Sequence, residues 1–223
     1  IWGRRADKNA EAAETLRGYG VRVFTDCVDV SDEAAIVAGF GRALEAMDRV
    51  DTVVANAGIA TQVPFTDIDI ARYRKLIDVN LDGAVFTLRE GARHMKARAE
   101  AGDPGGSLIV CGSGSIFQGV PTMAHYGIAK GALNALAKAL AAELGPIGVR
   151  CNVIAPGFIE TEMTFADPEQ GRMIAEMVSA RTPLGRAGKP ADLEGAVVYL
   201  ASDMSAYHTG DTLVVDGGKM SAN

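Results

Sequence analysis

The sequence has few cysteines, no long apolar run and no block of charge of one sign. Three cysteines occur among 223 residues, without Cys-x-x-Cys spacing. A disulfide-stapled fold is therefore excluded, and free thiols in a reducing, cytoplasmic compartment are expected. No apolar run approaches the roughly 20 residues that span a bilayer, so no membrane segment is expected. Acidic and basic residues are interspersed around a net charge of −6, which argues against nucleic acid as a partner.

The remaining composition is that of an ordinary globular domain, with 48% hydrophobic and 22% charged residues. There is no internal repeat and no low-complexity linker, so we expect a single domain over residues 1–223. His94 and His208 have no partners at metal-ligand spacing, and no metal site is predicted.

Short apolar runs alternate with helical patterns along the chain. Strands are expected at residues 21–25, 52–55, 107–111, 149–154 and 212–215. Helices are expected at residues 7–18, 31–47, 67–99, 122–144 and 191–202, with a loosened stretch at 78–83. Ser31 is the expected cap of the second helix. Residues 157–189 hold much of the Pro, Gly and Met and are interpreted as an irregular lid insertion.

This alternation predicts an α/β fold with a doubly wound, Rossmann-like parallel sheet and helices on both faces. The strands at 107–111 and 149–154 are apolar on both sides, as a doubly covered sheet requires. In such sheets, ligands bind beyond the carboxyl ends of the strands. Small or polar residues follow the strands there, in segments 26–30, 56–58, 112–115 and 155–157. Taken singly, each segment is no more than a turn signal.

The most specific pattern is Tyr126-x-x-x-Lys130 inside the Ala-rich helix. Residues four apart lie on one helix face. A cation beside a tyrosine favours the phenolate and lowers its pKa, so the pair is a plausible proton-transfer device. The pattern also occurs by chance in helices. Ser113 strengthens the interpretation, because it lies thirteen residues upstream at a strand end.

Further motifs occur in a fixed order around this set: Asp29-Val30, Asn56-Ala57-Gly58, Asn80 in DVNLDG, Pro156-Gly157 with Thr161, and Asp216-Gly217-Gly218. Together with Ser113, Tyr126 and Lys130 they resemble the classical short-chain dehydrogenase/reductase family over nearly the whole sequence. The resemblance implies hydride transfer between NAD(P)H and a carbonyl or secondary alcohol. It assigns proton transfer to Tyr126.

The resemblance also implies roles for the neighbouring residues. Lys130 would lower the pKa of Tyr126 and hold the nicotinamide ribose, and Ser113 would bind the substrate oxygen. Asn80 would kink its helix and hold a water linked to Lys130. The implied cofactor contacts are Arg4, Arg5, Asp29, Val30, Asn56, Ala57, Gly58, Tyr126, Lys130, Pro156, Gly157, Ile159 and Thr161.

Substrate contacts are expected from Ser113, Ser115, Phe117, His125 and Met163. For two of them another role stays open. Ser115 also suits a simple turn, and His125 equally suits a surface or partly buried position. The apolar residues of the insertion predict either a flexible lid or an ordinary helix packing face. They are Met163, Phe165, Met173 and Met177.

The cofactor preference is interpreted from the first residues, which look like the end of the family's second strand. An acid at that end binds the ribose hydroxyl of NAD, whereas a nearby basic residue suits the phosphate of NADP. Gly3 stands in the acid's place, and Arg4 and Arg5 follow. NADP(H) is therefore predicted as the preferred cofactor, with NAD(H) possible. Alternatively, one arginine caps the next helix and the other is solvated.

The sequence departs from the family in lacking its glycine-rich TGxxxGxG turn and the preceding strand. That strand is central in the family's sheet, so two sheet portions with unpaired edges are expected. From the family's layout and the length of one βα unit, we expect about 30–40 residues upstream of Ile1. Ile1 would then belong to the tail of the second strand.

The resemblance favours an NADP(H)-dependent oxidoreductase similar to 3-oxoacyl-[acyl-carrier-protein] reductases. Alternatives are a sugar or polyol dehydrogenase using NAD(H), an epimerase or dehydratase of the extended relatives, and a non-catalytic family member. The partner is expected to be a small-molecule carbonyl or alcohol. Family members are commonly homotetramers, which implies interfaces on the helices at 67–99 and 122–144 and on the last strand region.

Overall fold

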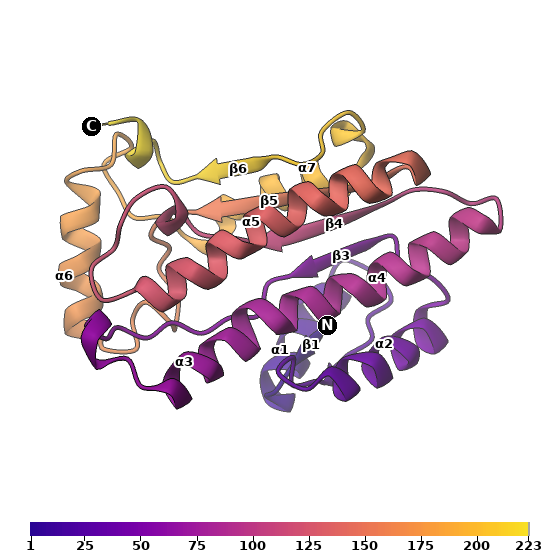
Figure 1. Ribbon diagram of the computed structural model, residues 1–223, viewed down its shortest axis with the longest axis horizontal. Coiled ribbons are helices and arrows are strands. Elements are labelled where there is room, and N and C mark those ends of the chain that lie inside the picture. Colours follow the sequence, from indigo (N-terminus) through magenta and orange to yellow (C-terminus); the bar gives the residue numbers. More distant parts are fainter. Residues whose placement is uncertain (223) are drawn as a thin grey trace.

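Strands and helices alternate from one end of the chain to the other in the computed structural model, which describes residues 1–222 (Figure 1). The strands are β1 (Trp2–Gly3), β2 (Asp26–Cys27), β3 (Thr52–Ala55), β4 (Gly106–Cys111), β5 (Val149–Pro156) and β6 (Thr212–Val215). The helices are α1 (Ala6–Arg17), α2 (Glu33–Met47), α3 (Ile70–Ile77), α4 (Gly83–Glu100), α5 (Ala124–Leu144), α6 (Pro168–Ser179) and α7 (Glu194–Ala201). The predicted α/β class is confirmed.

All strand pairs among the described residues are parallel. They form a four-stranded sheet in the order β3-β4-β5-β6 and a separate pair, β1-β2. Two sheet portions were expected from the sequence. A cavity of about 350 Å³ is lined by residues of both sheets, among them Trp2, Val53 and Ala55. Because the four strands of the larger sheet are parallel, their carboxyl ends point the same way, and the loops that follow them lie along one edge of the sheet.

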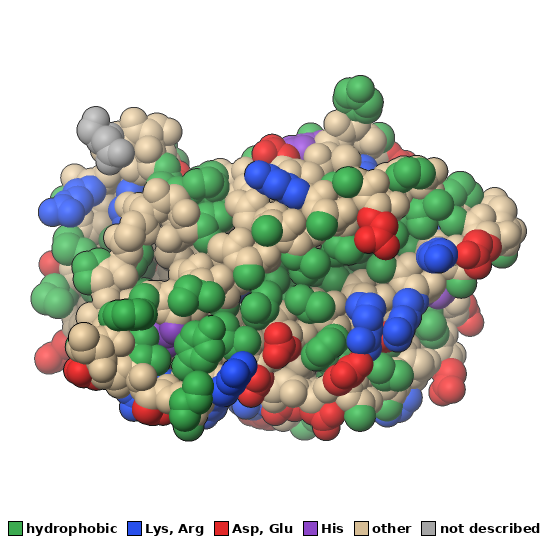
Figure 2. All heavy atoms as spheres, viewed as in Figure 1, with side chains coloured by type: hydrophobic (Ala, Val, Ile, Leu, Met, Phe, Trp, Pro, Cys, Tyr) green, Lys and Arg blue, Asp and Glu red, His purple; other side chains and the backbone are tan. Residues whose placement is uncertain are grey.

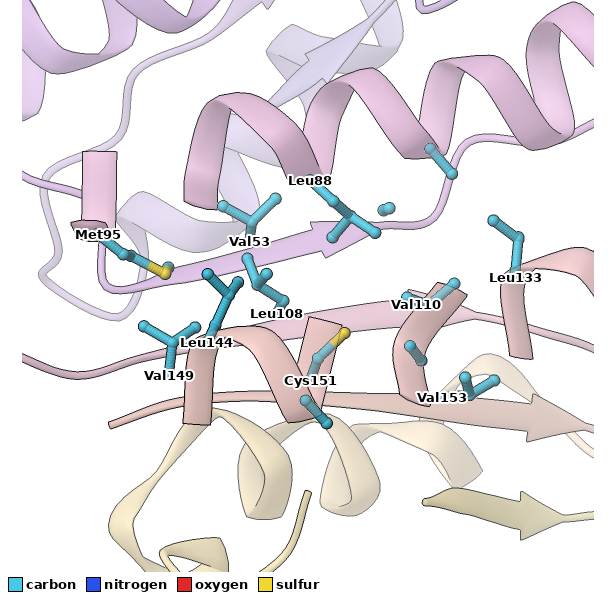
Figure 3. Packing of buried hydrophobic residues seen from close by; sticks show 14 of the residues in the cluster. Val53, Leu88, Met95, Leu108, Val110, Leu133, Leu144, Val149, Cys151 and Val153 are labelled. Carbon is cyan, nitrogen blue, oxygen red and sulfur yellow. The ribbon is translucent and has the colours of Figure 1, made fainter. Parts of the chain in front are cut away.

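Helices cover both faces of the four-stranded sheet. Successive side chains of β4 point to opposite faces, so they pack against different helices. Leu108 and Val110 pack in the main core with residues of α4 and α5, whereas Ile109 packs with Leu200 of α7. In Figure 1, α4 and α5 lie in front of the sheet and α7 lies behind it. Figure 3 shows the main core, in which Leu88, Leu133 and other apolar residues of these helices meet the strands. None of the helices formed by residues 1–222 is long and apolar enough to cross a membrane.

The predicted loosening of the long helix is a π-helical turn over Asp78–Asp82, between α3 and α4. Asn80 lies in this turn and is fully buried. Its side-chain amide hydrogen-bonds the backbone of Ile59, which follows the loop after β3. The irregular turn thus sets the side chain of Asn80 against the edge of the sheet where ligands bind.

Three local predictions are corrected. The strand expected at residues 21–25 is wrong: those residues form no strand, and the strand lies just after them at Asp26–Cys27, the residues that face Trp2 and Gly3 of β1. The cap of α2 is Asp32, whose carboxylate accepts from the N–H groups of Ala34 and Ala35. The hydroxyl of Ser31 instead donates to Asp29 at 2.7 Å.

The third correction concerns the insertion at 157–189, which contains the regular helix α6. Asp167 caps this helix by accepting from the N–H groups of Glu169 and Gln170, and Pro168 occupies the first helical position. Proline fits there because the missing N–H has no helical partner at that position. Met173 and Met177 of α6 are exposed.

Candidate active site

A cavity of about 880 Å³ lies at the carboxyl ends of the strands, where doubly wound sheets bind ligands. Its walls come from segments that follow β1 to β5, so residues far apart in sequence meet there. The predicted residues that line it are Arg4, Arg5, Asp29, Val30, Asn56, Ala57, Gly58, Ser113, Tyr126, Lys130, Pro156, Gly157, Ile159, Thr161 and Met163. The four predicted residues that do not line it are Asn80, Ser115, Phe117 and His125.

Tyr126 and Lys130 reach the cavity from one face of α5, as their spacing predicts. The Lys130 ammonium nitrogen lies 5.9 Å from the centroid of the Tyr126 ring. It donates a hydrogen bond to the backbone oxygen of Cys111 at 2.7 Å. Lys130 is 4% exposed, and the Cys111 carbonyl gives its buried ammonium group a hydrogen-bond acceptor. Ser113 follows Cys111 by two residues, which brings the end of β4 to both side chains.

Burial has opposite effects on the two titratable groups. It raises the pKa of Tyr126, because the phenolate loses solvation, and the nearby hydroxyl of Ser113 opposes this rise. Burial also lowers the pKa of Lys130, because the ammonium loses solvation. The sequence assigned control of the Tyr126 pKa to Lys130. In the structure, burial has the largest effect on the pKa of Tyr126 and raises it, whereas Ser113 lowers it.

Asn80 fixes the loop after β3 from behind the cavity wall. Its amide nitrogen donates to the Ile59 carbonyl at 2.8 Å, and its amide oxygen accepts from the Ile59 N–H at 2.7 Å. A Cβ placed on Gly58 would stand 3.5 Å from the Asn80 amide oxygen and 3.7 Å from the Lys130 ammonium nitrogen. Gly58, Asn80 and Lys130 therefore meet at one point, and Asn80 holds the wall against which a ligand would rest.

The loop after β5 lies on the far side of the cavity. Gly157 packs so closely on the C-terminal segment that a Cβ would meet Asp216 at 2.8 Å. Asp216 in turn accepts from the N–H groups of Gly218 and Met220, both at 2.8 Å. Gly217 and Gly218 have φ angles of 69° and 87°, which favour glycine. The Asp-Gly-Gly segment thus forms a tight turn that packs against the loop after β5.

Sequence reasoning missed Thr164, which organises the same loop. Its hydroxyl donates to the Ile159 carbonyl at 2.7 Å and accepts from the Thr161 N–H at 2.9 Å. A threonine three residues after another in a loop is a signal for such a turn, because hydroxyls bond nearby backbone groups. Thr164 lines the cavity together with Thr161.

The opposite end of the cavity carries most of its charge. Arg4 lies 3.9 Å from a carboxylate oxygen of Asp29, and Arg5 lies 3.0 Å from Glu162. The pKa of Asp29 is lowered, first by hydrogen bonds from Ser31 and then by the charge of Arg4. Both arginines are more than half exposed, so they are available to an anionic ligand. Arg5 is the N-cap residue of α1, where its backbone carbonyl accepts from the Asn9 N–H at 3.0 Å and its side chain makes no capping hydrogen bond.

His125 is fully buried, so the surface or partly buried position considered for it is wrong. Its Nε2 shares a 2.7 Å hydrogen bond with the hydroxyl of Thr61, another residue that sequence reasoning missed. Within residues 1–222, His125 Nδ1 and Ser115 Oγ are buried without a hydrogen-bond partner. Phe117 is 52% exposed and Met163 is 47% exposed. The described residues contain no group of three or more His, Cys, Asp or Glu that could hold a metal ion.

Comparison with known proteins places the geometry in context. A family model described as enoyl-(acyl carrier protein) reductase matches residues 1–220. An L-rhamnose 1-dehydrogenase (NAD(P)(+)) from Azotobacter vinelandii is 39% identical over 209 residues, covering 94% of this chain and 78% of that protein. An NADP-dependent (R)-specific alcohol dehydrogenase from Lentilactobacillus kefiri is 40% identical over 222 residues, covering 98% of this chain and 84% of that protein.

A solved structure is similar over the whole chain. It is a gluconate 5-dehydrogenase from Burkholderia cenocepacia in complex with NADP and tartrate. The TM-score is 0.91 at 33% sequence identity, and the match covers 100% of this chain and 85% of that one. The similarity therefore extends from the order of the strands to the edge of the sheet that carries the cavity.

Proposed function

Because the chain belongs to the short-chain dehydrogenase/reductase family, whose members here are NAD(P)-dependent oxidoreductases acting on CH-OH groups, we propose that it transfers a hydride between NADP(H) and a carbonyl or secondary alcohol. One observation carries the proposal. Ser113, Tyr126 and Lys130 line the same cavity as the loops that follow β1, β3 and β5. A proton donor and a binding cleft for an extended ligand therefore share one space.

The residues present suit a nicotinamide dinucleotide. The cavity of about 880 Å³ is of the size that cofactor sites occupy. Gly157 stands where the backbone must come close to another segment, because a Cβ there would lie 2.8 Å from Asp216. Arg4 and Asp29 would hold the adenine end, and the backbone at Ile159 with Thr161 would hold the carboxamide end. When bound, this cofactor supplies or accepts the hydride.

Tyr126 is the proposed general acid and base. In reduction its hydroxyl donates a proton to the oxygen of the substrate carbonyl as negative charge develops there. In oxidation its phenolate accepts the proton of the alcohol. Ser113 supports both directions by donating a hydrogen bond to the same oxygen, where charge is greatest in the transition state.

Lys130 and Asn80 are proposed to support Tyr126 without touching the reacting carbon. The ammonium of Lys130, 5.9 Å from the ring centroid, favours the phenolate by its charge when it is protonated. Asn80 keeps the loop after β3 in place through its two hydrogen bonds to Ile59. We further propose that the π-helical turn positions Asn80 to hold a water molecule that is linked to Lys130.

The test replaces Tyr126 with Phe and follows NADPH oxidation by absorbance with a panel of ketones. We expect kcat to fall by about 100-fold or more, because general acid catalysis contributes at that level. Binding of NADPH, measured by fluorescence titration, is expected to change little. Activity that survives Tyr126→Phe unchanged would remove the proposed mechanism.

Preference for NADP(H) is proposed from the charges at the adenine end. Gly3 offers no carboxylate for a ribose hydroxyl, while the exposed guanidinium of Arg4 suits a phosphate. We expect kcat/KM for NADPH to exceed that for NADH, and Arg4→Asp to weaken NADPH use. A clear preference of the unaltered protein for NADH would contradict this part alone.

A sugar or polyol is the second candidate substrate class, because the relatives include an L-rhamnose 1-dehydrogenase and a gluconate 5-dehydrogenase. Resemblance to acyl-carrier reductases favours a 3-oxoacyl thioester instead. A substrate panel containing both classes decides between them. Met163, which lines the cavity, is proposed to shape the pocket, and residues 157–189 with α6 to cover it.

We also propose that the protein forms a homotetramer through the outer surfaces of α4 and α5. Figure 2 shows hydrophobic side chains gathered over this part of the molecule, with charges of both signs interspersed around them. Ile128 of α5 is 50% exposed there. Light scattering measures the mass in solution, and a monomer at micromolar concentration would contradict the proposal.

The free cysteines suit the reducing conditions of the cytoplasm.

A further inference from the structure

Gly3 and Asn9 form a contact that no feature of the proposed mechanism uses. Gly3 ends β1, and Asn9 is in the first turns of α1. The Asn9 amide nitrogen donates to the carbonyls of Gly3 and Asp26, at 3.0 Å each. Asn9 is 6% exposed, and this one buried side chain ties α1 to the last residue of β1 and the first residue of β2.

The same contact forbids a side chain at position 3. A Cβ on Gly3 would stand 2.5 Å from the amide oxygen of Asn9, well inside van der Waals contact. The backbone is not the obstacle, because Gly3 is absent from the described glycines with positive φ. Asn9 could relieve the clash by rotating, but that would break its two hydrogen bonds. The requirement for glycine therefore lies in the side chain of Asn9.

Position 3 also lies where the two cofactors differ. Gly3, Asn9 and Arg4 all line the charged end of the cavity. A carboxylate at the end of this strand selects the free ribose hydroxyls of NAD and repels a phosphate. While Asn9 keeps its two hydrogen bonds, position 3 has no room for that carboxylate.

We propose that Asn9 is a specificity-determining residue, which keeps the strand end free of an acidic side chain and so preserves the site for a cofactor phosphate beside Arg4. This inference rests on the proposed NADP(H) function. It adds a residue on α1 that acts through position 3, and it predicts that a switch toward NADH requires changes at both positions.

The first arm of the test measures thermal unfolding of the full chain and needs no cofactor. Gly3→Ala adds only the Cβ, and overpacking of this size is expected to lower Tm by several degrees. In an Asn9→Ala background the same change is expected to cost at most half as much. Asn9→Ser, with a shorter side chain, provides a second background in case Asn9→Ala does not fold. Equal costs in the altered and unaltered backgrounds would overturn the inference.

The second arm measures Kd for NADH and NADPH by fluorescence titration. Gly3→Asp with Asn9→Ala is expected to bind NADH about tenfold tighter than Asn9→Ala alone, as a charged hydrogen bond would provide. Gly3→Asp alone is expected to gain less than half of that factor. A full gain from the single change would overturn the role of Asn9. A preference of the unaltered protein for NADH would overturn the NADP(H) proposal, while the Tm comparison still judges the contact.

Discussion

At the scale of single residues, the cavity combines groups whose burial works against stability. Lys130 is 4% exposed and its pKa is lowered by that burial. A buried ammonium costs free energy unless it is paired and hydrogen-bonded, and the structure gives it the Cys111 carbonyl. A polar residue kept at such a cost is typical of a functional site rather than of a packing position.

Lys130→Met is therefore expected to remove activity while leaving Tm unchanged or raised. The sign follows from the lowered pKa. Between that pKa and the usual value of 10.5 the unfolded chain binds more protons than the folded one, so the stability of the unaltered protein rises with pH in this window. The gain in Tm from Lys130→Met should consequently shrink as pH rises toward 10.5. Thermal unfolding at several pH values measures it, and a large loss of Tm near pH 7 would contradict the argument.

Thr164→Val keeps the shape of the side chain and removes the hydrogen bonds of its hydroxyl in the loop after β5, among them those to the Ile159 carbonyl and from the Thr161 N–H. Each bond is worth about 1 kcal/mol, so the loop is expected to lose its fixed form. We expect KM for NADPH to rise several-fold with a smaller change in kcat, and steady-state kinetics measures both. Thr164→Ser, which retains the hydroxyl, is the matched control and should restore most of the affinity. An unchanged KM in Thr164→Val would show that the loop does not depend on this residue.

At the scale of elements, local chemistry decides where helices begin, whereas a long-range contact accompanies the place where one of them loosens. Asp32 caps α2 and Asp167 caps α6, in both cases through a carboxylate that accepts from two backbone N–H groups. The π-helical turn over Asp78–Asp82 is different, because a long-range pair of hydrogen bonds between Asn80 and Ile59 accompanies it. Caps can be interpreted from neighbouring residues, whereas the use of the π turn depends on a loop 21 residues away.

Asp32→Ala is expected to lower the free energy of unfolding by about 1 kcal/mol, as loss of an N-cap does. For a chain of this size that corresponds to a fall in Tm of about 2–4 °C. Ser31→Ala is the matched control, because Ser31 bonds Asp29 rather than the helix N-terminus. Thermal denaturation followed by circular dichroism measures both. If the serine variant lost more stability than the aspartate variant, the assignment of the cap would be wrong.

At the scale of the whole molecule, the pH dependence of the reaction reports how the fold surrounds Tyr126. Burial between α5, β4 and the loops raises the pKa of this tyrosine. In the proposed mechanism oxidation requires the Tyr126 phenolate, so its rate is expected to rise with pH across the neutral and alkaline range. Reduction in that mechanism requires the phenol, so its rate should fall only at high pH. Initial rates in both directions from pH 6 to 11 measure this, and an oxidation rate independent of pH would contradict it.

Local patterns of residues were enough to predict the alternation of strands and helices, the parallel sheet and the placement of Tyr126 and Lys130 on one helix face. These features depend on the periods of helix and strand, which are local and are fixed by neighbouring residues. Tertiary structure alone decided that His125 is buried and that Thr164 holds the loop after β5. It also decided that Asn9 excludes a side chain at Gly3. Burial and close approach require packing of separate elements, which no local pattern specifies.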